Sequence, residues 1–272
     1  MNAMKKMAMA LALIGTVGGA QAFTLNNLDG TYNNFGGFDW ASSGSVWIKD
    51  YNFLNNKNAG FTDTFTMQYM AKATGLLPVA GGNNLVTDGL NHTYEYTIFG
   101  NFNMKGTCMP GAASCSMVRF DILGGNWGIY YDTTPATFHN PAVGTHVTDG
   151  IKIVSGQVDA QVGAAFAPQG PSNPGNGFSA FSMRGSVDFT NSDYIVPDIK
   201  TTQALGTLQF GSFQNAWYRP TTFDGVSTGV NSNTSFVAQA DSNQSLFVPE
   251  PGSLALLGLG MLGFGAIRRR KA

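Results

Sequence analysis

The chain has 272 residues, and only 11% of them are charged. The part between its two terminal segments holds nine basic and 15 acidic residues, so its net charge is about −6. A body of that sign excludes nucleic acid as a partner, because phosphates need basic side chains. An aromatic content of 12% also excludes low-complexity disorder. The length allows one large domain or two small ones.

The first 22 residues have the three parts of a secretory signal peptide. Lys5 and Lys6 form a short positive region, an uncharged apolar run follows, and Ala20 and Ala22 occupy the positions that a signal peptidase inspects. An N-terminal core helix is the alternative, but the segment has no polar face. Cleavage after Ala22 is therefore expected, which leaves Phe23 as the N-terminus of the exported body.

The body, residues 23–247, alternates between apolar and polar residues with a period of two. Alternation bounded by Gly, Asn and Asp predicts antiparallel strands with one buried face. We expect an all-β fold, either a β-sandwich of two antiparallel sheets or a jelly-roll variant. Residues 167–177 contain three prolines and three glycines and are expected to form a loop, which could also divide two subdomains. The predicted inward-facing residues are Phe65, Met67, Tyr69, Tyr94, Tyr96, Ile98, Val118, Phe120, Ile122, Trp127, Ile129, Tyr131, Met183, Gly185, Val187, Phe189, Leu208 and Phe210.

The two cysteines of the chain, Cys108 and Cys115, lie on either side of the turn dipeptide Pro110-Gly111. Outside the cytoplasm such a pair is expected to be oxidised, and a loop this short stabilises the fold by about 2.5 kcal/mol. The spacing fits neither a CxxC redox motif nor a zinc site.

Two short motifs resemble catalytic or cofactor signatures. The sequence GVSTG at 225–229 fits a nucleophile elbow, but every histidine precedes its serine, whereas the elbow requires Asp and then His after it. The sequence GLGMLG at 258–263 fits a dinucleotide fingerprint, but it lies in an apolar terminal segment where no βαβ unit can follow. We therefore predict no catalytic residues and no cofactor.

The three histidines, His92, His139 and His146, lack metalloprotease spacing. The last two lie in a turn-rich segment flanked by Asp132 and Asp149, where a calcium or transition-metal site is conceivable. Residues of these types also form ordinary turns, and we predict no metal.

A carbohydrate site could take two forms, a glycosidase or a sugar-binding surface. A glycosidase needs two carboxylates about 5 to 9.5 Å apart, and Asp121 with Asp132, or Glu95, are the available candidates. The sequence favours no pair among them. A sugar-binding surface would need exposed aromatic side chains, and core packing is the alternative use of Trp40, Trp47, Trp127 and Trp217.

The C-terminal end combines an apolar segment with a basic cluster. Residues 252–267 carry no charge, and as a helix they would rise about 24 Å, against a hydrocarbon core of about 30 Å. This is short for a permanent span, although arginines can snorkel and a bilayer can thin. Positive charge stays on the cytoplasmic side, so the body is predicted to lie outside. The predicted anchor runs from Gly252, Ser253 and Leu254 to Ile267, and the basic cluster is Arg268, Arg269, Arg270 and Lys271.

The sequence Val248-Pro249-Glu250-Pro251 stands directly before this segment. Together with the apolar run and the basic terminus, it resembles the PEP-CTERM sorting signal, which would occupy residues 248–272. The resemblance implies recognition by an exosortase, cutting near the motif, and transfer of the body from a membrane-anchored precursor to the surface or polysaccharide matrix of a Gram-negative-type bacterium. The prolines hold the motif extended, where an enzyme can reach its backbone, and they also suit the start of a helix.

The body itself contains the sequences YEYTIFGNFNMKG, NWGIYYDTTP and GTHVTDGIKIVSGQV in that order. This order resembles the flocculation-associated PEP-CTERM proteins of exopolysaccharide-forming bacteria. The resemblance implies a non-catalytic surface protein that helps cells aggregate, with extracellular polysaccharide as a candidate partner. The alternatives are an enzyme that acts on polysaccharide, which would show a carboxylate pair in an open groove, and a sugar-binding module, which would show exposed coplanar aromatics.

Overall fold

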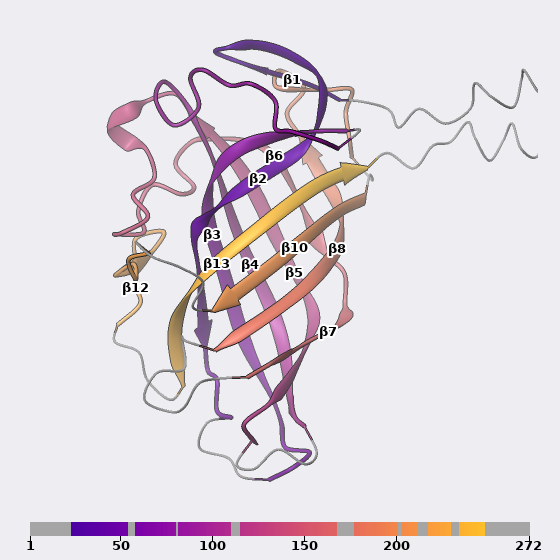
Figure 1. The fold of residues 1–272 in the computed structure, drawn as a ribbon, viewed down its shortest axis with the longest axis vertical. Helices are drawn as coiled ribbons and strands as arrows, with labels where there is room; N and C mark the ends of the chain where they lie inside the picture. Colours follow the sequence, from indigo (N-terminus) through magenta and orange to yellow (C-terminus); the bar gives the residue numbers. More distant parts are fainter. Residues whose placement is uncertain are drawn as a thin grey trace, which may run out of the picture. The chain divides into compact units, whose positions relative to one another are not determined.

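The computed structural model describes residues 23–53, 58–79, 81–109, 115–167, 177–200, 203–211, 217–229 and 234–247. Within these ranges the chain forms one eleven-stranded sheet and a separate two-stranded hairpin, and no α-helix (Figure 1). Every strand pairing is antiparallel apart from one isolated bridge. The all-β antiparallel class is therefore confirmed. Residues 22–246 form one compact unit.

The strands follow in chain order. They are β1 (Phe23–Asn27), β2 (Gly30–Lys49), β3 (Thr62–Pro78), β4 (Glu95–Cys108), β5 (Val118–Asp132), β6 (Ile151–Val158), β7 (Gln161–Phe166), β8 (Phe178–Thr190), β9 (Ile195–Val196), β10 (Gln203–Gly211), β11 (Thr222–Phe223), β12 (Val226–Ser227) and β13 (Ser235–Phe247). A single turn of 3-10 helix, η2 (Pro135–Thr137), follows β5.

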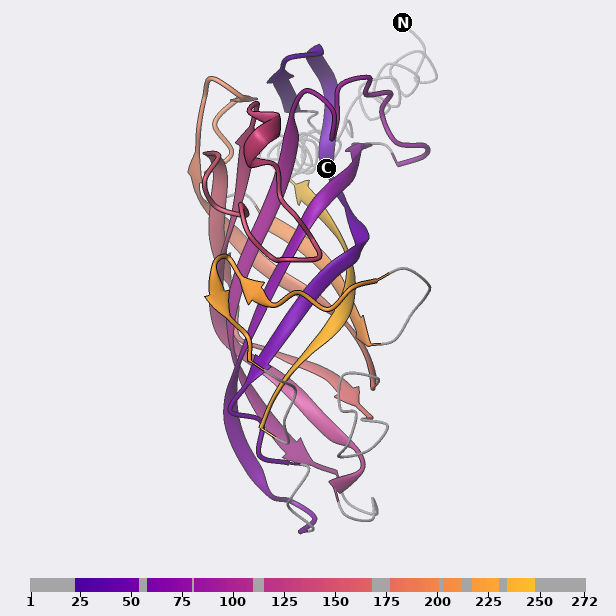
Figure 2. The same cartoon turned by 90° about the vertical axis from the view of Figure 1, so that its left-hand side faces the viewer.

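The sheet closes on itself because its last strand pairs with one of its first. β13 runs antiparallel to β2, from the pair Ser235–Lys49 to the pair Ser245–Gly37. This contact joins the ends of the strand order β2, β3, β4, β5, β6, β8, β10 and β13 into a ring, and the curl of the sheet can be followed in Figures 1 and 2. The sequence predicted two separate sheets packed face to face, whereas the structure has one continuous sheet that closes on itself.

The length of β2 makes this closure possible. Its first residues pair with β1, in the register Phe23–Phe35, and its remaining residues use the same edge for β13. Register shifts within β2, between Phe35 and Gly37 and again between Trp40 and Ser45, bend the strand. A long, bulged strand can therefore curve from one side of the sheet to the other.

Aromatic side chains fill the interior. One cluster of stacked and edge-to-face rings surrounds Tyr51, just beyond the end of β2, and another surrounds Phe38 near its start. Burial of each large side chain contributes roughly 1.5 to 3 kcal/mol. The first cluster contains Tyr51, Phe53, Phe65, Phe120, Phe166, Phe210 and Phe236, and the second contains Phe38, Trp40, Tyr94, Tyr96 and Tyr131. A small cavity beside Tyr69 and Gln244 measures about 30 Å³, which is enough room for a water molecule.

The alternation predicted from the sequence is confirmed along most strands. In β3, for example, Phe65 and Met67 are buried, while Thr64 is exposed. Phe189 is an exception, because the structure leaves it 39% exposed although the pattern places it inside. A register shift against β6 puts Val187 opposite Gly156 and Phe189 opposite Ser155, so that Asp188 is an extra residue. Such a bulge reverses the faces of the residues that follow it.

Candidate functional site

The predicted sorting and cleavage residues border the part of the chain that the structure describes. Ala20 and Ala22 precede it, the motif and tail at 248–271 follow it, and neither group has a described position. Phe23 is fully buried at the start of β1. It pairs with Phe35 of β2. Gly37, two residues further along β2, pairs with Ser245 near the end of β13. The chain therefore enters and leaves the body at the same end of the sheet.

No helix within the described ranges combines the length and the apolar character needed to cross a membrane. The apolar segment predicted to be the anchor, residues 252–267, lies outside those ranges.

The two cysteines meet at the opposite end of the sheet. Cys108 ends β4, Cys115 precedes β5, and the structure joins them in a disulfide with a Cα–Cα distance of 5.2 Å. Both are buried. Cys108 also donates its backbone N–H to Phe61 at 2.8 Å, and it lies opposite Val118 in the β4–β5 ladder. The disulfide therefore fixes the two strands where they leave the ladder.

Glu95 departs from the predicted alternation. It lies between Tyr94 and Tyr96, which are predicted to face inward, so alternation places it on the solvent face. Only 1% of it is exposed, because the connection between β5 and β6 folds over this part of β4. Its carboxyl accepts a hydrogen bond of 2.5 Å from the backbone N–H of His139, a buried residue of that connection. Burial raises the pKa of Glu95 to about 7, against the lowering effect of this hydrogen bond. The carboxyl therefore holds a loop in place.

The two histidines of this connection make contacts within the same loop. The ring nitrogen Nδ1 of His139 lies 2.8 Å from the carbonyl oxygen of Thr145, and burial lowers the pKa of His139. His146 instead contacts Asp149 on the surface, with Nδ1 2.6 Å from the carboxylate. Within the described ranges, no group of three or more His, Cys, Asp or Glu side chains is placed to hold a metal ion. His139 and His146 thus make separate local contacts.

The carboxylates considered for glycoside hydrolysis do not form an open pair. Asp121 and Asp132 lie eleven residues apart on β5, which corresponds to about 36 Å of strand, far beyond glycosidase spacing. Glu95 and Asp132 are cross-strand neighbours, but Glu95 is buried. Asp132 accepts hydrogen bonds from the N–H of Thr134 and the hydroxyl of Thr137, which begin the covering loop.

The tryptophans and the GVSTG motif have structural positions. Trp40, Trp47 and Trp127 are 7% exposed or less, so they belong to the core. Trp217 packs partly buried on a small cluster and donates its indole N–H to Ser45. Residues 225–229 begin in the turn of a tight hairpin of β11 and β12 and continue through β12, which contains Ser227. A nucleophile elbow would instead require a strand and then a helix.

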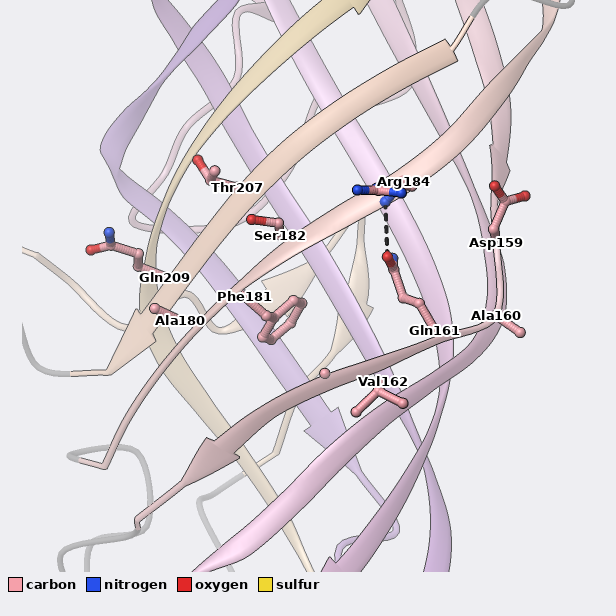
Figure 3. A pocket seen from close by; sticks show the side chains of 11 residues that line it. Asp159, Ala160, Gln161, Val162, Ala180, Phe181, Ser182, Arg184, Thr207 and Gln209 are labelled. Atoms are coloured by element: carbon pink, nitrogen blue, oxygen red, sulfur yellow. Dashed lines mark hydrogen bonds between the residues drawn. The ribbon is translucent and has the colours of Figure 1, made fainter.

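A groove opens on the outer face of the sheet between β7 and β8 (Figure 3). It measures about 840 Å³, within the range of binding pockets for small molecules. The exposed side chain of Val162 supplies apolar surface, and the ring of Phe181, which is 8% exposed, also borders the groove. The polar side chains that line it are Asp159, Gln161, Ser182, Arg184, Thr207 and Gln209.

The groove exists because the segment that contains β7 is longer than the part of β8 beside it. Val158 pairs with Gly185 at one end, and Ala167 pairs with Phe178 at the other. Between these two pairs the β7 side has eight residues and the β8 side has six. The two extra residues bow β7 away from β8, and its paired edge faces β5. The sequence carries no local signal of this mismatch, which is why sequence reasoning did not find the groove.

The C-terminal segment matches a known family model. Residues 247–271 match the PEP-CTERM protein-sorting motif. The chain carries a PEP-CTERM sorting signal. This confirms the resemblance inferred from Val248-Pro249-Glu250-Pro251 and the residues after it.

The PEP-CTERM signal fixes the route of the protein. It indicates an extracellular protein of a Gram-negative bacterium, made as a membrane-anchored precursor and processed by an exosortase. No match is found for this chain among curated proteins or among solved structures. The similarity of the body to flocculation-associated proteins therefore stays a prediction.

Proposed function

We propose that this PEP-CTERM protein is a non-catalytic structural component of the cell surface or extracellular matrix, where it promotes adhesion between cells. The observation that carries the proposal is the sorting signal at residues 247–271, which delivers the body outside the cell. A closed sheet with an aromatic-filled interior and a disulfide suits a durable extracellular part.

The features of the body favour a structural role over catalysis. The carboxylates Glu95 and Asp132 are engaged in holding a loop, and Asp121 is far from both along the strands. The histidines of that loop make local contacts with a backbone carbonyl and a surface carboxylate. An enzyme that acts on polysaccharide is the alternative function.

The test compares cells that lack the protein with cells that carry the full chain or the Glu250→Ala variant. The full chain should restore aggregation and fractionate with the matrix, whereas Glu250→Ala should accumulate as unprocessed precursor in the membrane. Glu250→Gln is the matched control for side-chain size. Cells without the protein that aggregate as well as the parent would contradict the adhesive role. Release of reducing ends from matrix polysaccharide by the purified full chain would contradict the non-catalytic role.

A further inference from the structure

The groove between β7 and β8 exposes backbone groups as well as side chains. The N–H of Arg184 donates to the side-chain oxygen of Gln161, and its carbonyl accepts the N–H of Asp159. Six residues earlier on β8, Phe178 exchanges hydrogen bonds with Ala167. Since alternate residues of a strand direct their backbone groups to the same side, those of Ala180 and Ser182 also face β7.

Along this stretch, which lies wholly within the described residues, no ladder joins β7 to β8. The donors and acceptors of Ala180 and Ser182 therefore open into the groove, where solvent or a ligand can satisfy them. The side-chain nitrogen of Gln161, in the wall of the groove, is buried and has no hydrogen-bond partner among the described residues. A buried donor of this kind gains from a ligand that supplies an acceptor.

The side chains around these groups are short and uncharged for the most part. In the β8–β10 ladder, Thr207 lies opposite Ser182 and Gln209 lies opposite Ala180, and all four are exposed. Together they present hydroxyl and amide groups on one outer surface, with the ring of Phe181 beneath (Figure 3). Such a surface can both donate and accept hydrogen bonds, as the hydroxyls of a sugar do. Phe181, the one aromatic residue in the lining, is only 8% exposed, so hydrogen bonds rather than ring stacking would hold a sugar here.

The charge of the groove argues against an acidic polymer as its ligand, and its closed ends argue against a peptide strand. Asp159 and Arg184 contribute one charge of each sign, so the lining is neutral overall and offers no basic cluster for an acidic polymer. An inserted peptide strand would need a continuous ladder, but direct bonds at Asp159–Arg184 and Ala167–Phe178 close the opening at both ends. A polymer that lies across the outer surface does not have to fit between these two closed ends.

We propose that this groove binds a neutral polysaccharide chain, which lies across β7, β8 and β10 and hydrogen-bonds to the open backbone edge of Ala180 and Ser182. The proposal rests on the proposed function in the matrix and names the site through which the protein holds that matrix.

The test uses the full chain purified in detergent and oligosaccharides cut from the matrix polysaccharide of the producing cells, separated into neutral and acidic fractions. Calorimetric titration should show binding of the neutral fraction. Thr207→Trp, which fills the groove, should weaken binding by at least about tenfold. The matched control is Thr62→Trp, an exposed strand residue on β3 that β4 and β5 separate from the groove. Gln209→Ala, a smaller change, should weaken binding in the same direction.

Hydrogen exchange provides a second measurement, because a bound chain should slow exchange of the Ala180 and Ser182 amides. Failure of the neutral fraction to bind, binding of the acidic fraction alone, or equal affinities of Thr207→Trp and Thr62→Trp would overturn the proposal. Aggregation and matrix fractionation of cells carrying each variant separate the two hypotheses. If the protein restores aggregation while Thr207→Trp behaves as wild type, only the groove assignment fails.

Discussion

We predict that the stability of the Glu95→Gln variant relative to wild type increases from acidic to alkaline pH. Burial raises the pKa of this carboxyl from its ordinary value of 4.5 to about 7. Between these values the unfolded chain ionises and the folded protein does not, so the stability of wild type falls as the pH rises and then levels off. The shift corresponds to about 3 kcal/mol. The glutamine side chain cannot ionise, but it keeps an oxygen that can accept the hydrogen bond from the N–H of His139.

The difference between the two proteins should therefore be constant below pH 4.5, grow until about pH 7, and stay constant above it. For a domain of this size, 3 kcal/mol corresponds to roughly 6 to 12 °C in Tm. The assay is thermal unfolding of the full chain in mild detergent, followed by tryptophan fluorescence across this range. Burial also lowers the pKa of His139, which removes stability as the pH falls below 6.5, but this effect is common to both proteins and cancels in the difference. A difference that does not change with pH, or that shrinks as the pH rises, would refute the reasoning.

The remaining predictions concern the two ends and the disulfide. N-terminal sequencing of the exported protein should find Phe23 as the first residue, and an intact signal segment on that protein would contradict the expected export route. The variants Cys108→Ser and Cys115→Ser should each lose roughly 2.5 kcal/mol of stability, measured by chemical unfolding, and wild type under reducing conditions should match them; labelling of both thiols in the native oxidised protein would show that the disulfide is absent. Replacing Pro249 and Pro251 by alanine should leave unprocessed precursor in the membrane fraction, detected by immunoblotting of a tail tag, because helix can then extend through the motif. Normal processing of that variant would mean that the extended backbone is not what the exosortase requires.

The features that could be predicted from the sequence are those that depend on residues close together in the chain. Alternation placed Phe65 and Met67 on the buried face of a strand, and the turn between Cys108 and Cys115 predicted their disulfide. The sorting signal was also recognisable, because its motif, apolar run and basic cluster are contiguous.

What the sequence could not predict depends on distant pairing. The closure joins β13 to β2, and an alternating strand does not specify its partner. Glu95 fits an exposed pattern and is buried only because a loop more than 40 residues later folds over it. Phe189 faces solvent because of one extra residue at Asp188, and the groove near Ser182 exists because of two. Insertions of this size leave the composition and the period almost unchanged.

The closing strand also decides how the body responds to pulling. β13 is the last strand before the sorting segment, and it lies between β2 and β10. While the tail is held in the membrane, any force that acts along the axis of β13 loads this strand at its C-terminal end. Its ten residue pairs with β2 are then loaded in shear and must yield together, rather than opening one after another as at a peeled edge. Forced unfolding is governed by the unfolding rate, so pairing of β13 with a strand on each side slows its detachment under load.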